Sequence, residues 1–338
     1  MTKYFKRIKL DAPIPAMTRE GIEQKYKMDL PSYDEDHAVH VDEEGKKWLF
    51  LVKEGPSMDI TSPLSTLSEA FHWEFANQIK RNVPTTHVVD VEGGKSGVLT
   101  KSFLEDGEFL KNLIDIYPQF KDRAFYYSGY HDMRNLNMET VSKEVLSQTS
   151  DEFRETFYTN IIDKYVFANI DSHNGHNFGV IFSGVNARMS PTYDLEHAPP
   201  FATHRVMMAT DGLSHVRQGI CERTAEHLRQ HAPHLLDECF EHLIPFVKSP
   251  DFEELCLSMD TDALVEHALR RYHYDKYVFH HLKAPDFSME SVDENKFAHM
   301  KKRLQDIGKS CLAFYKSHAE VLDSQIYGGR QSLVKRDM

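Results

Sequence analysis

The sequence predicts an α+β fold with a small strand-rich N-terminal part and a larger, mostly helical C-terminal part. Three observations predict it. Residues 30–104 contain four short strand-like runs interrupted by one helical stripe. Residues 225–322 carry apolar side chains at helical spacing through most of their length. Between these regions, a polar loop at residues 171–177 directly precedes a strand-like run, which is typical of a loop that positions ligands.

The composition narrows the class of protein. The chain has 338 residues, which is enough for one large domain or two lobes. Its net charge of −12 argues against a nucleic-acid partner, because such binders normally carry a basic footprint. No apolar run reaches the length of a spanning helix, and the first residues lack the apolar core of a signal peptide, so we expect no transmembrane segment.

The four cysteines are widely spaced and form no Cys-x-x-Cys pair: Cys221, Cys239, Cys256 and Cys311. This pattern is typical of buried free thiols rather than of a disulfide framework or a zinc site. The sequence therefore predicts a reducing compartment, either the cytoplasm of the producing cell or that of a host cell.

The N-terminal part begins with an irregular arm over residues 1–30, which contains two prolines. Residues 37–42 and 48–53 then predict a hairpin. A helix is predicted over residues 65–81 from apolar side chains at four-residue steps. Runs at 86–91 and 96–103 predict a second hairpin. This order of strand, strand, helix, strand, strand is not the alternating pattern of a parallel α/β sheet.

The C-terminal part contains one strong helix before the polar loop. Residues 151–167 carry one apolar face and begin at Asp151, which we expect to cap the helix. Residues 105–150 are polar and receive no assignment. Residues 196–218 have a loose pattern and receive no regular element. Helices are predicted over residues 225–247, 252–282 (in pieces) and 296–322. We expect the tail at 327–338 to be disordered.

Three polar residues suggest the chemistry. Phosphoryl transfer needs one carboxylate to orient a hydroxyl, and an amide with a second carboxylate to hold Mg²⁺ against nucleotide phosphates. Asp171, Asn177 and Asp194 can fill these roles.

The same residues carry a family resemblance. The run Asp-x-His-x-x-x-Asn from Asp171 to Asn177, followed by Pro-x-Tyr-Asp-Leu ending at Leu195, resembles the HipA family of kinases. The resemblance implies that Asp171 is the catalytic residue and that Asn177 and Asp194 bind Mg²⁺. The family loop is one residue shorter, so Asn174 remains the alternative amide; we favour Asn177 because it directly precedes the strand.

The resemblance also implies a two-lobed protein-kinase-like fold. Residues 1–104 would form a small antiparallel-sheet N-lobe, and residues 105–326 a helical C-lobe. Lys53, at a strand end, would pair with the phosphates of ATP and be braced by Glu69, with Glu74 as the alternative.

Three further residues would contact the nucleotide. Ser32 lies in the segment where the phosphate-covering loop is expected, although that segment has no glycine and carries three acidic residues. Lys101 and Phe103, at the end of the last predicted strand, would form the hinge that faces adenine.

The predicted function is an ATP- and Mg²⁺-dependent kinase that transfers phosphate to a serine or threonine hydroxyl of a protein substrate. Longer HipA members carry an extra N-terminal subdomain and pair with an antitoxin. Only about fifty residues precede Lys53, so the chain resembles shorter kinases, including those that bacterial pathogens deliver into host cells as effectors. Whether a small-molecule activator is needed stays open.

Several alternatives remain. Residues 171–174 also resemble the loop of lipid and inositol kinases, although no basic membrane-facing patch accompanies them. Transfer of AMP instead of phosphate, or a pseudokinase scaffold that binds nucleotide without turnover, would use the same fold. Asp171, His173 and His176 could instead bind a transition metal, or the cluster could only stabilise a turn.

Overall fold

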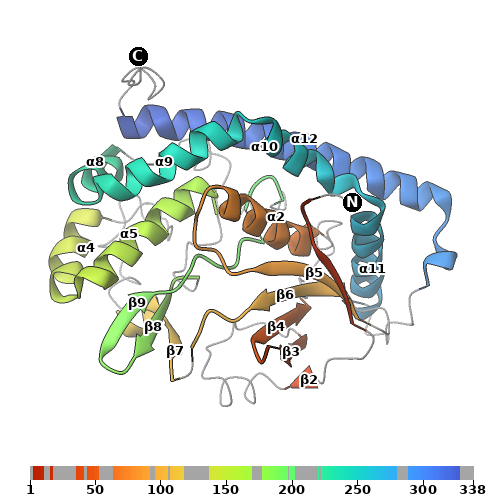
Figure 1. Cartoon of the computed structure of the whole chain (residues 1–338), viewed down its shortest axis with the longest axis horizontal. Helices are drawn as coiled ribbons and strands as arrows, with labels where there is room; N and C mark the ends of the chain where they lie inside the picture. Colours follow the sequence, from red (N-terminus) through yellow and green to blue (C-terminus); the bar gives the residue numbers. More distant parts are fainter. Residues whose placement is uncertain are drawn as a thin grey trace.

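The computed structural model describes residues 3–10, 16–17, 36–41, 44–52, 64–91, 96–105, 107–117, 137–169, 177–196, 198–201, 220, 222–279 and 288–327. These residues form an α+β structure that is mostly helical and contains two small sheets (Figure 1). The α+β class predicted from the sequence is confirmed. Of the predicted tail at residues 327–338, Tyr327 is the last residue of the C-terminal helix, and the rest lies outside the described residues.

The larger sheet has six strands in the order β1-β5-β6-β4-β3-β2. Their bounds are Arg7–Leu10 (β1), Ala16–Met17 (β2), Asp36–Val41 (β3), Lys47–Val52 (β4), Thr86–Val91 (β5) and Ser96–Lys101 (β6). Strands β3 to β6 are the two predicted hairpins, and the helix between them is also confirmed.

Two details of the predicted sheet are wrong. The N-terminal arm is not wholly irregular, because it supplies β1 and β2. The sheet is also not wholly antiparallel, since β1 pairs with β5 in parallel, with Arg7 opposite Val88. A chain that arrives from outside the hairpins can add an edge strand in either direction.

The smaller sheet is antiparallel, in the order β7-β8-β9: Phe109–Asn112 (β7), Gly179–Ser183 (β8) and Asn186–Met189 (β9). Strand β7 lies within residues 105–150, for which no element was predicted. The turn between β8 and β9 contains Gly184 at φ 61°, a left-handed conformation that favours glycine.

The helices pack against parts of the two sheets and against one another. They are α2 (Ser65–Gln78), α3 (Leu113–Ile116), α4 (Met138–Glu144), α5 (Asp151–Val166), α8 (Glu222–His231), α9 (Pro233–Val247), α10 (Pro250–Leu257), α11 (Asp262–Phe279) and α12 (Glu294–Tyr327), with 3-10 turns η5 (Leu146–Gln148), η7 (Ser258–Asp260) and η8 (Met289–Ser291). Within the described part of the chain, none of these helices has both the length and the apolarity needed to cross a bilayer.

Two helix ends differ from the prediction. The cap of α5 is Ser150, whose hydroxyl accepts a hydrogen bond from the Phe153 amide, whereas Asp151 lies in the first turn. The predicted helix at 225–247 is divided into α8 and α9. Pro233 begins α9 because its ring fits the first turn of a helix but not an interior position.

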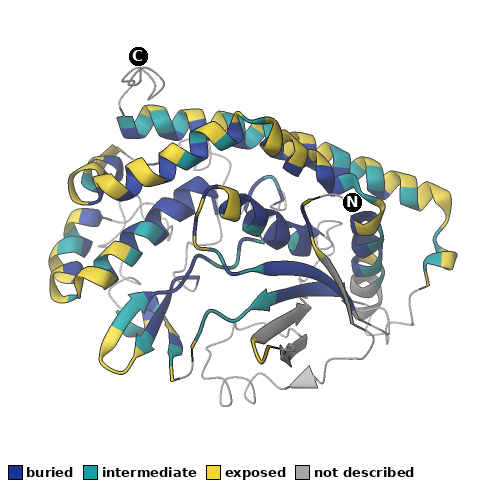
Figure 2. Ribbon diagram, in the orientation of Figure 1, coloured by how far each residue is buried: buried dark blue, intermediate teal, exposed yellow. Residues whose placement is uncertain are grey.

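Helix α2 forms the centre of the packing. It lies on β5 and β6, while α12 runs across α8, α9, α10 and α11 (Figure 1). Figure 2 shows α2, β5 and β6 mostly in the colour of buried residues, and α12 with an exposed outer side. Phe71 and Phe75 of α2 are fully buried. The burial of such aromatic side chains contributes about 2–3 kcal/mol each.

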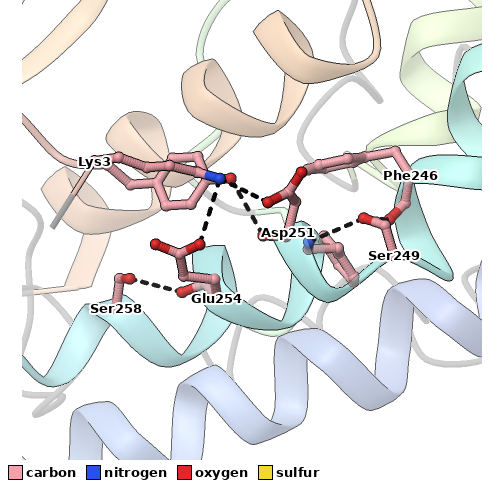
Figure 3. Close-up of polar contacts among 8 residues, drawn as sticks. Lys3, Phe246, Ser249, Asp251, Glu254 and Ser258 are labelled. Carbon is pink, nitrogen blue, oxygen red and sulfur yellow. Dashed lines mark hydrogen bonds and ion pairs between the residues drawn. The ribbon is translucent and has the colours of Figure 1, made fainter.

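The N-terminal segment is attached to α10 (Figure 3) and to α2. Lys3 Nζ lies 2.6 Å from Asp251 Oδ1 and 3.3 Å from Glu254 Oε2, and the Tyr4 hydroxyl donates to the Asp251 carbonyl. The Phe5 amide donates to Glu74 Oε1 at 3.0 Å. The Lys3 ion pairs are exposed and stabilise little, whereas the bond to Glu74 is buried.

The close approach of α12 to α10 yields a first prediction. A Cβ atom at Gly308 would lie 2.3 Å from the Cys256 carbonyl oxygen, which is backbone and cannot move away. We expect Gly308→Ala to lower the free energy of unfolding by about 1–3 kcal/mol, although alanine is the better helix former. The midpoint of urea-induced unfolding measures this loss of stability. Ser310→Ala, on the exposed side of the same helix, is the control, and equal midpoints for the two variants would contradict the packing described.

The buried imidazole of His87 yields a second prediction. It packs edge-on against Trp73, with ring centroids 5.0 Å apart, and burial lowers its pKa from 6.5 to about 4. Between these two values the unfolded chain binds a proton that the folded chain does not. The contribution of His87 to stability is therefore complete above pH 6.5 and is lost as the pH falls towards 4.

We expect His87→Phe to reduce the slope of unfolding free energy against pH within this window, because phenylalanine keeps a ring but cannot titrate. Urea titrations at several pH values between about 4.5 and 7 measure the slope of the unfolding free energy against pH. We expect the difference between the two slopes to correspond to about one proton at most. His299→Phe, at an exposed position, is the matched control. Identical slopes for His87→Phe and the wild type would show that His87 is not buried in its neutral form.

Candidate active site

The first end of the predicted catalytic loop is attached to Asp194. After α5 ends, Ala168 turns the chain with φ 51°, and the Asn169 amide donates to the Lys164 carbonyl at 3.2 Å. The Asn169 side chain is fully buried, and its Nδ2 donates to the Asp194 carbonyl at 3.0 Å. The residue two positions before Asp171 thus contacts the second candidate aspartate.

The other end of the loop leads into β8 beside the same segment. Asn177 is 8% exposed, and two residues later the Gly179 carbonyl accepts from the Ser190 amide at 2.8 Å. A Cβ at Gly179 would lie 2.5 Å from a methyl group of Leu110 and 2.9 Å from Ser190 Oγ. A larger residue would therefore displace these two side chains where the chain enters β8.

Asp194 has an unusual backbone conformation. Its φ of 59° is left-handed, which costs roughly 1–2 kcal/mol for a residue with a side chain, although aspartate tolerates it better than most. The Asp194 carbonyl is bound by Asn169, and the next carbonyl, that of Leu195, accepts from Ser68 Oγ of α2 at 2.7 Å. Such conformations persist where surrounding contacts determine them, and they are frequent at functional sites.

A buried polar network supports the chain just before Asp194. Arg81 Nε donates to Asp163 Oδ1 at 2.5 Å, and Thr192 Oγ1 donates to Asp163 Oδ2 at 3.2 Å. Asn160 Nδ2 donates to the Ser190 carbonyl at 2.7 Å. Burial raises the pKa of Asp163, and the Arg81 charge opposes that rise. This network fixes the Ser190–Thr192 backbone to α5.

The sequence analysis missed this network. Asn160, Asp163 and Lys164 lie among the buried residues of α5, and the Lys164 ammonium lies 5.0 Å from the centre of the Phe178 ring. The sequence pattern that could have revealed these buried residues is a set of polar residues at helical spacing beside the apolar face of the predicted 151–167 helix. A charged residue in that position is buried only when it is paired, which marks a structural or functional site.

The two candidate glutamates of α2 differ in their surroundings. Glu69 is buried and directly follows Ser68, which binds the Leu195 carbonyl. Glu74, the alternative, accepts the Phe5 amide, and burial raises the pKa of its carboxyl group. Glu74 is thus engaged by the N-terminal segment. Lys53 lies outside the described residues, so its pairing with Glu69 stays a prediction.

The predicted hinge lies beside the Asp194 segment. Lys101 is the last residue of β6, and the Phe103 ring stacks on Tyr193 with centroids 5.9 Å apart and planes 22° apart. Tyr193 immediately precedes Asp194 and was not a predicted site residue. Its position in the Pro-x-Tyr-Asp-Leu motif could have identified it as a candidate site residue.

The remaining candidate site residues cannot be placed. Ser32, Asp171 and Asn174 lie outside the described residues, as do the histidines of the alternative transition-metal site. Among the residues that the structure describes, no three His, Cys, Asp or Glu side chains gather as a metal site. Asn177 and Asp194 offer one amide and one carboxylate, and such oxygen ligands suit Mg²⁺.

The Arg81–Asp163 pair yields a third prediction. Both side chains are almost fully buried, so Asp163→Leu would leave an unpaired buried charge and lower the free energy of unfolding by about 3–5 kcal/mol. Arg81→Met should do the same. The double variant should be more stable than either single variant, because it removes both charges. Chemical unfolding of all four proteins measures this coupling, and additive losses would mean that the two charges do not depend on each other.

Comparisons with known proteins place the chain in a family. Among solved structures, it is similar to a Helicobacter pylori proinflammatory kinase, CtkA, at 10% sequence identity and a TM-score of 0.45, over 94% of this chain and 99% of that one. No curated protein matches the sequence. A family model described as the HipA-like C-terminal domain matches residues 18–245, which is more than half of the 338 residues. The chain therefore belongs to the HipA-like C-terminal domain family.

Proposed function

We propose that this protein is an ATP- and Mg²⁺-dependent kinase that phosphorylates a serine or threonine hydroxyl of a protein substrate. Membership of the HipA-like family supports kinase activity. The observation that carries the proposal is the attachment of Asp194 to both Asn169 and, through Leu195, Ser68. In this proposal residues 1–104 and 105–326 are the two lobes of a protein-kinase-like fold, with the site between them.

Each candidate residue has a defined task in this proposal. Asp171 orients the acceptor hydroxyl and takes its proton, while Asn177 and Asp194 hold Mg²⁺. Lys53, braced by Glu69, holds the nucleotide phosphates. When bound, Mg²⁺ neutralises charge on the transferring phosphoryl group. Such positioning and charge stabilisation supply most of the acceleration in this reaction class.

The conformation of Asp194 supports its role in metal binding. Because the carbonyl of Asp194 and that of Leu195 are both bound by protein donors, the backbone is fixed independently of any cation. The carboxylate of a residue held in this way needs little reorganisation when a ligand arrives, and preorganisation of this kind increases affinity.

The stacked pair of Phe103 and Tyr193 supports a nucleotide site next to the metal ligands. Phe103 follows the predicted hinge strand, and Tyr193 is adjacent to Asp194 in the chain. Both side chains are half-buried. A partly open aromatic surface beside a strand end suits the planar face of a nucleobase. Lys101 would contribute its backbone groups, and Ser32 would lie over the phosphates.

The cysteines support a reducing compartment for this activity. Cys239, Cys256 and Cys311 are free and buried in the described part of the chain, and burial raises the pKa of Cys239 to about 12. Thiols in this state are inert and persist in the cytoplasm. We therefore propose that the kinase acts in the cytoplasm of the producing cell or, as an effector, in that of a host cell.

A fourth prediction tests the proposed function. Asp194→Asn keeps a residue type that tolerates the left-handed conformation but removes the charge that would bind Mg²⁺. We expect transfer of radiolabelled phosphate from ATP to a generic protein acceptor to fall by at least about 100-fold. Asp306→Ala removes an exposed carboxylate of α12 and is the matched control. Equal transfer by Asp194→Asn and the wild type would overturn the assignment of Asp194.

Intact mass spectrometry of the reacted proteins identifies the transferred group. A kinase adds about 80 Da per event, whereas an AMP transferase adds about 329 Da. Nucleotide-dependent thermal stabilisation without any added mass would instead indicate a pseudokinase. Phosphate on an inositol lipid but not on any protein acceptor would move the proposal to the lipid kinase class.

A further inference from the structure

Tyr315 of α12 is a buried residue that the proposed function does not use. Its hydroxyl lies 3.2 Å from the Phe167 carbonyl, 3.1 Å from the Pro199 carbonyl and 2.6 Å from His72 Nε2. The side chain is only 1% exposed. One phenol thus contacts three segments that are far apart in the sequence.

Each of these segments leads to a different candidate site residue. Phe167 lies two residues before Asn169, which binds the Asp194 carbonyl and opens the loop of Asp171. Pro199 directly follows Ala198, whose amide donates to the Leu195 carbonyl. His72 lies one helical turn after Ser68 and Glu69 in α2. The Tyr315 hydroxyl therefore contacts all three segments that lead to candidate site residues.

The protonation of this cluster is constrained by its acceptors. The Ser68 carbonyl, 2.7 Å from His72 Nδ1, can only accept, so Nδ1 carries the proton of the imidazole. Burial lowers the pKa of His72 to about 4, so the ring is neutral near pH 7 and Nε2 accepts. Burial also raises the pKa of Tyr315 well above its usual range, so the phenol keeps its single proton, which it can donate at full strength to only one of these three acceptors at a time.

The ring of Tyr315 has a separate role from its hydroxyl. It packs against Phe75 with centroids 4.8 Å apart and against Phe71 at 6.1 Å, both in α2. These contacts depend on the aromatic ring alone and would survive removal of the oxygen atom. Tyr315→Phe therefore separates the positioning of the three backbone segments from the packing of the core.

We propose that Tyr315, acting with His72, is a positioning residue for the nucleotide and Mg²⁺ site, because its hydroxyl fixes α2, the start of the Asp171 loop and the turn after Asp194 relative to one another. The proposal rests on the kinase function proposed above. It assigns to the C-terminal helix, remote in sequence from every candidate site residue, a direct part in the geometry of the site.

The experiment compares Tyr315→Phe with Tyr327→Phe. Tyr327 belongs to the same helix and donates its hydroxyl to Asp237 of α9. Both variants therefore lose one phenol oxygen from α12, but only Tyr315 contacts the segments of the site. Phosphate transfer is measured against ATP and Mg²⁺ concentration, at a temperature well below both melting midpoints. The His72→Phe variant and the double variant with Tyr315→Phe complete a cycle.

For Tyr315→Phe we expect the half-saturating Mg²⁺ concentration to rise by about 3–10-fold and kcat to fall by about 10–100-fold, because small displacements of positioned groups have effects of this size. Tyr327→Phe should leave both unchanged. If the two residues act as one pair, the double variant should lose no more than the more affected single variant.

Three results would overturn the proposal. Wild-type values for Tyr315→Phe would mean that the hydroxyl only stabilises the fold. Equal changes in Tyr327→Phe would mean that any loss of stability in α12 affects the site. Absence of phosphate transfer and of Mg²⁺-dependent ATP binding in the wild type would instead reject the kinase function itself, which distinguishes that failure from the other two.

Discussion

The arrangement of the candidate site depends on one constraint, the left-handed backbone of Asp194. Two consecutive carbonyl groups at this point are bound by side chains, the first by Asn169 and the second by Ser68. One donor comes from the end of α5 and the other from α2, so the conformation forms only after both helices have packed. A conformation that is unfavourable in an isolated peptide is thus stabilised by tertiary structure. Asp194 therefore adopts this conformation only in the folded protein.

Helix α2 is held by polar contacts along its whole length, in addition to its apolar packing. Thr66 contacts the buried His267 of α11 at 3.0 Å, and the next contacts along the helix are Ser68 with the Leu195 carbonyl and His72 with Tyr315. Glu74 completes the series by accepting the Phe5 amide. A buried polar group that loses its partner costs about 1–3 kcal/mol. Displacing α2 would break several such contacts together, so its position, and with it that of Glu69, does not depend on a single ion pair.

The sequence was sufficient for features that depend on local pattern. The alternation in β3 to β6, the stripe of α2 and the apolar face of α5 each arise within one segment, and each was predicted correctly. What it could not supply depends on contacts between distant segments. Residues 7–10 form a strand only because β5 offers them an edge, and Tyr193 gains its stacking partner only when β6 ends beside it. Of the predicted site residues, Glu69 and Asn177 are buried and Asp194 is half-buried, whereas Asp171 and Lys53 lie outside the described residues. The roles of all five residues stay predictions.

The buried charges of Arg81 and Asp163 are related to the same constraint on the Asp194 backbone. An apolar replacement of Arg81 and Asp163 could pack equally well, because burying an ion pair seldom stabilises a protein more than burying hydrocarbon. Apolar side chains, however, do not distinguish one backbone register from the next. The Asp163 carboxylate binds both Arg81 and Thr192, and Asn160 binds the Ser190 carbonyl, so a shift of the chain along α5 would break the Thr192 and Ser190 contacts together. Asp194 lies two residues beyond Thr192, and a shift by one position would carry it out of reach of Asn169. The buried charges are therefore best understood as the means by which the fold places a single carboxylate.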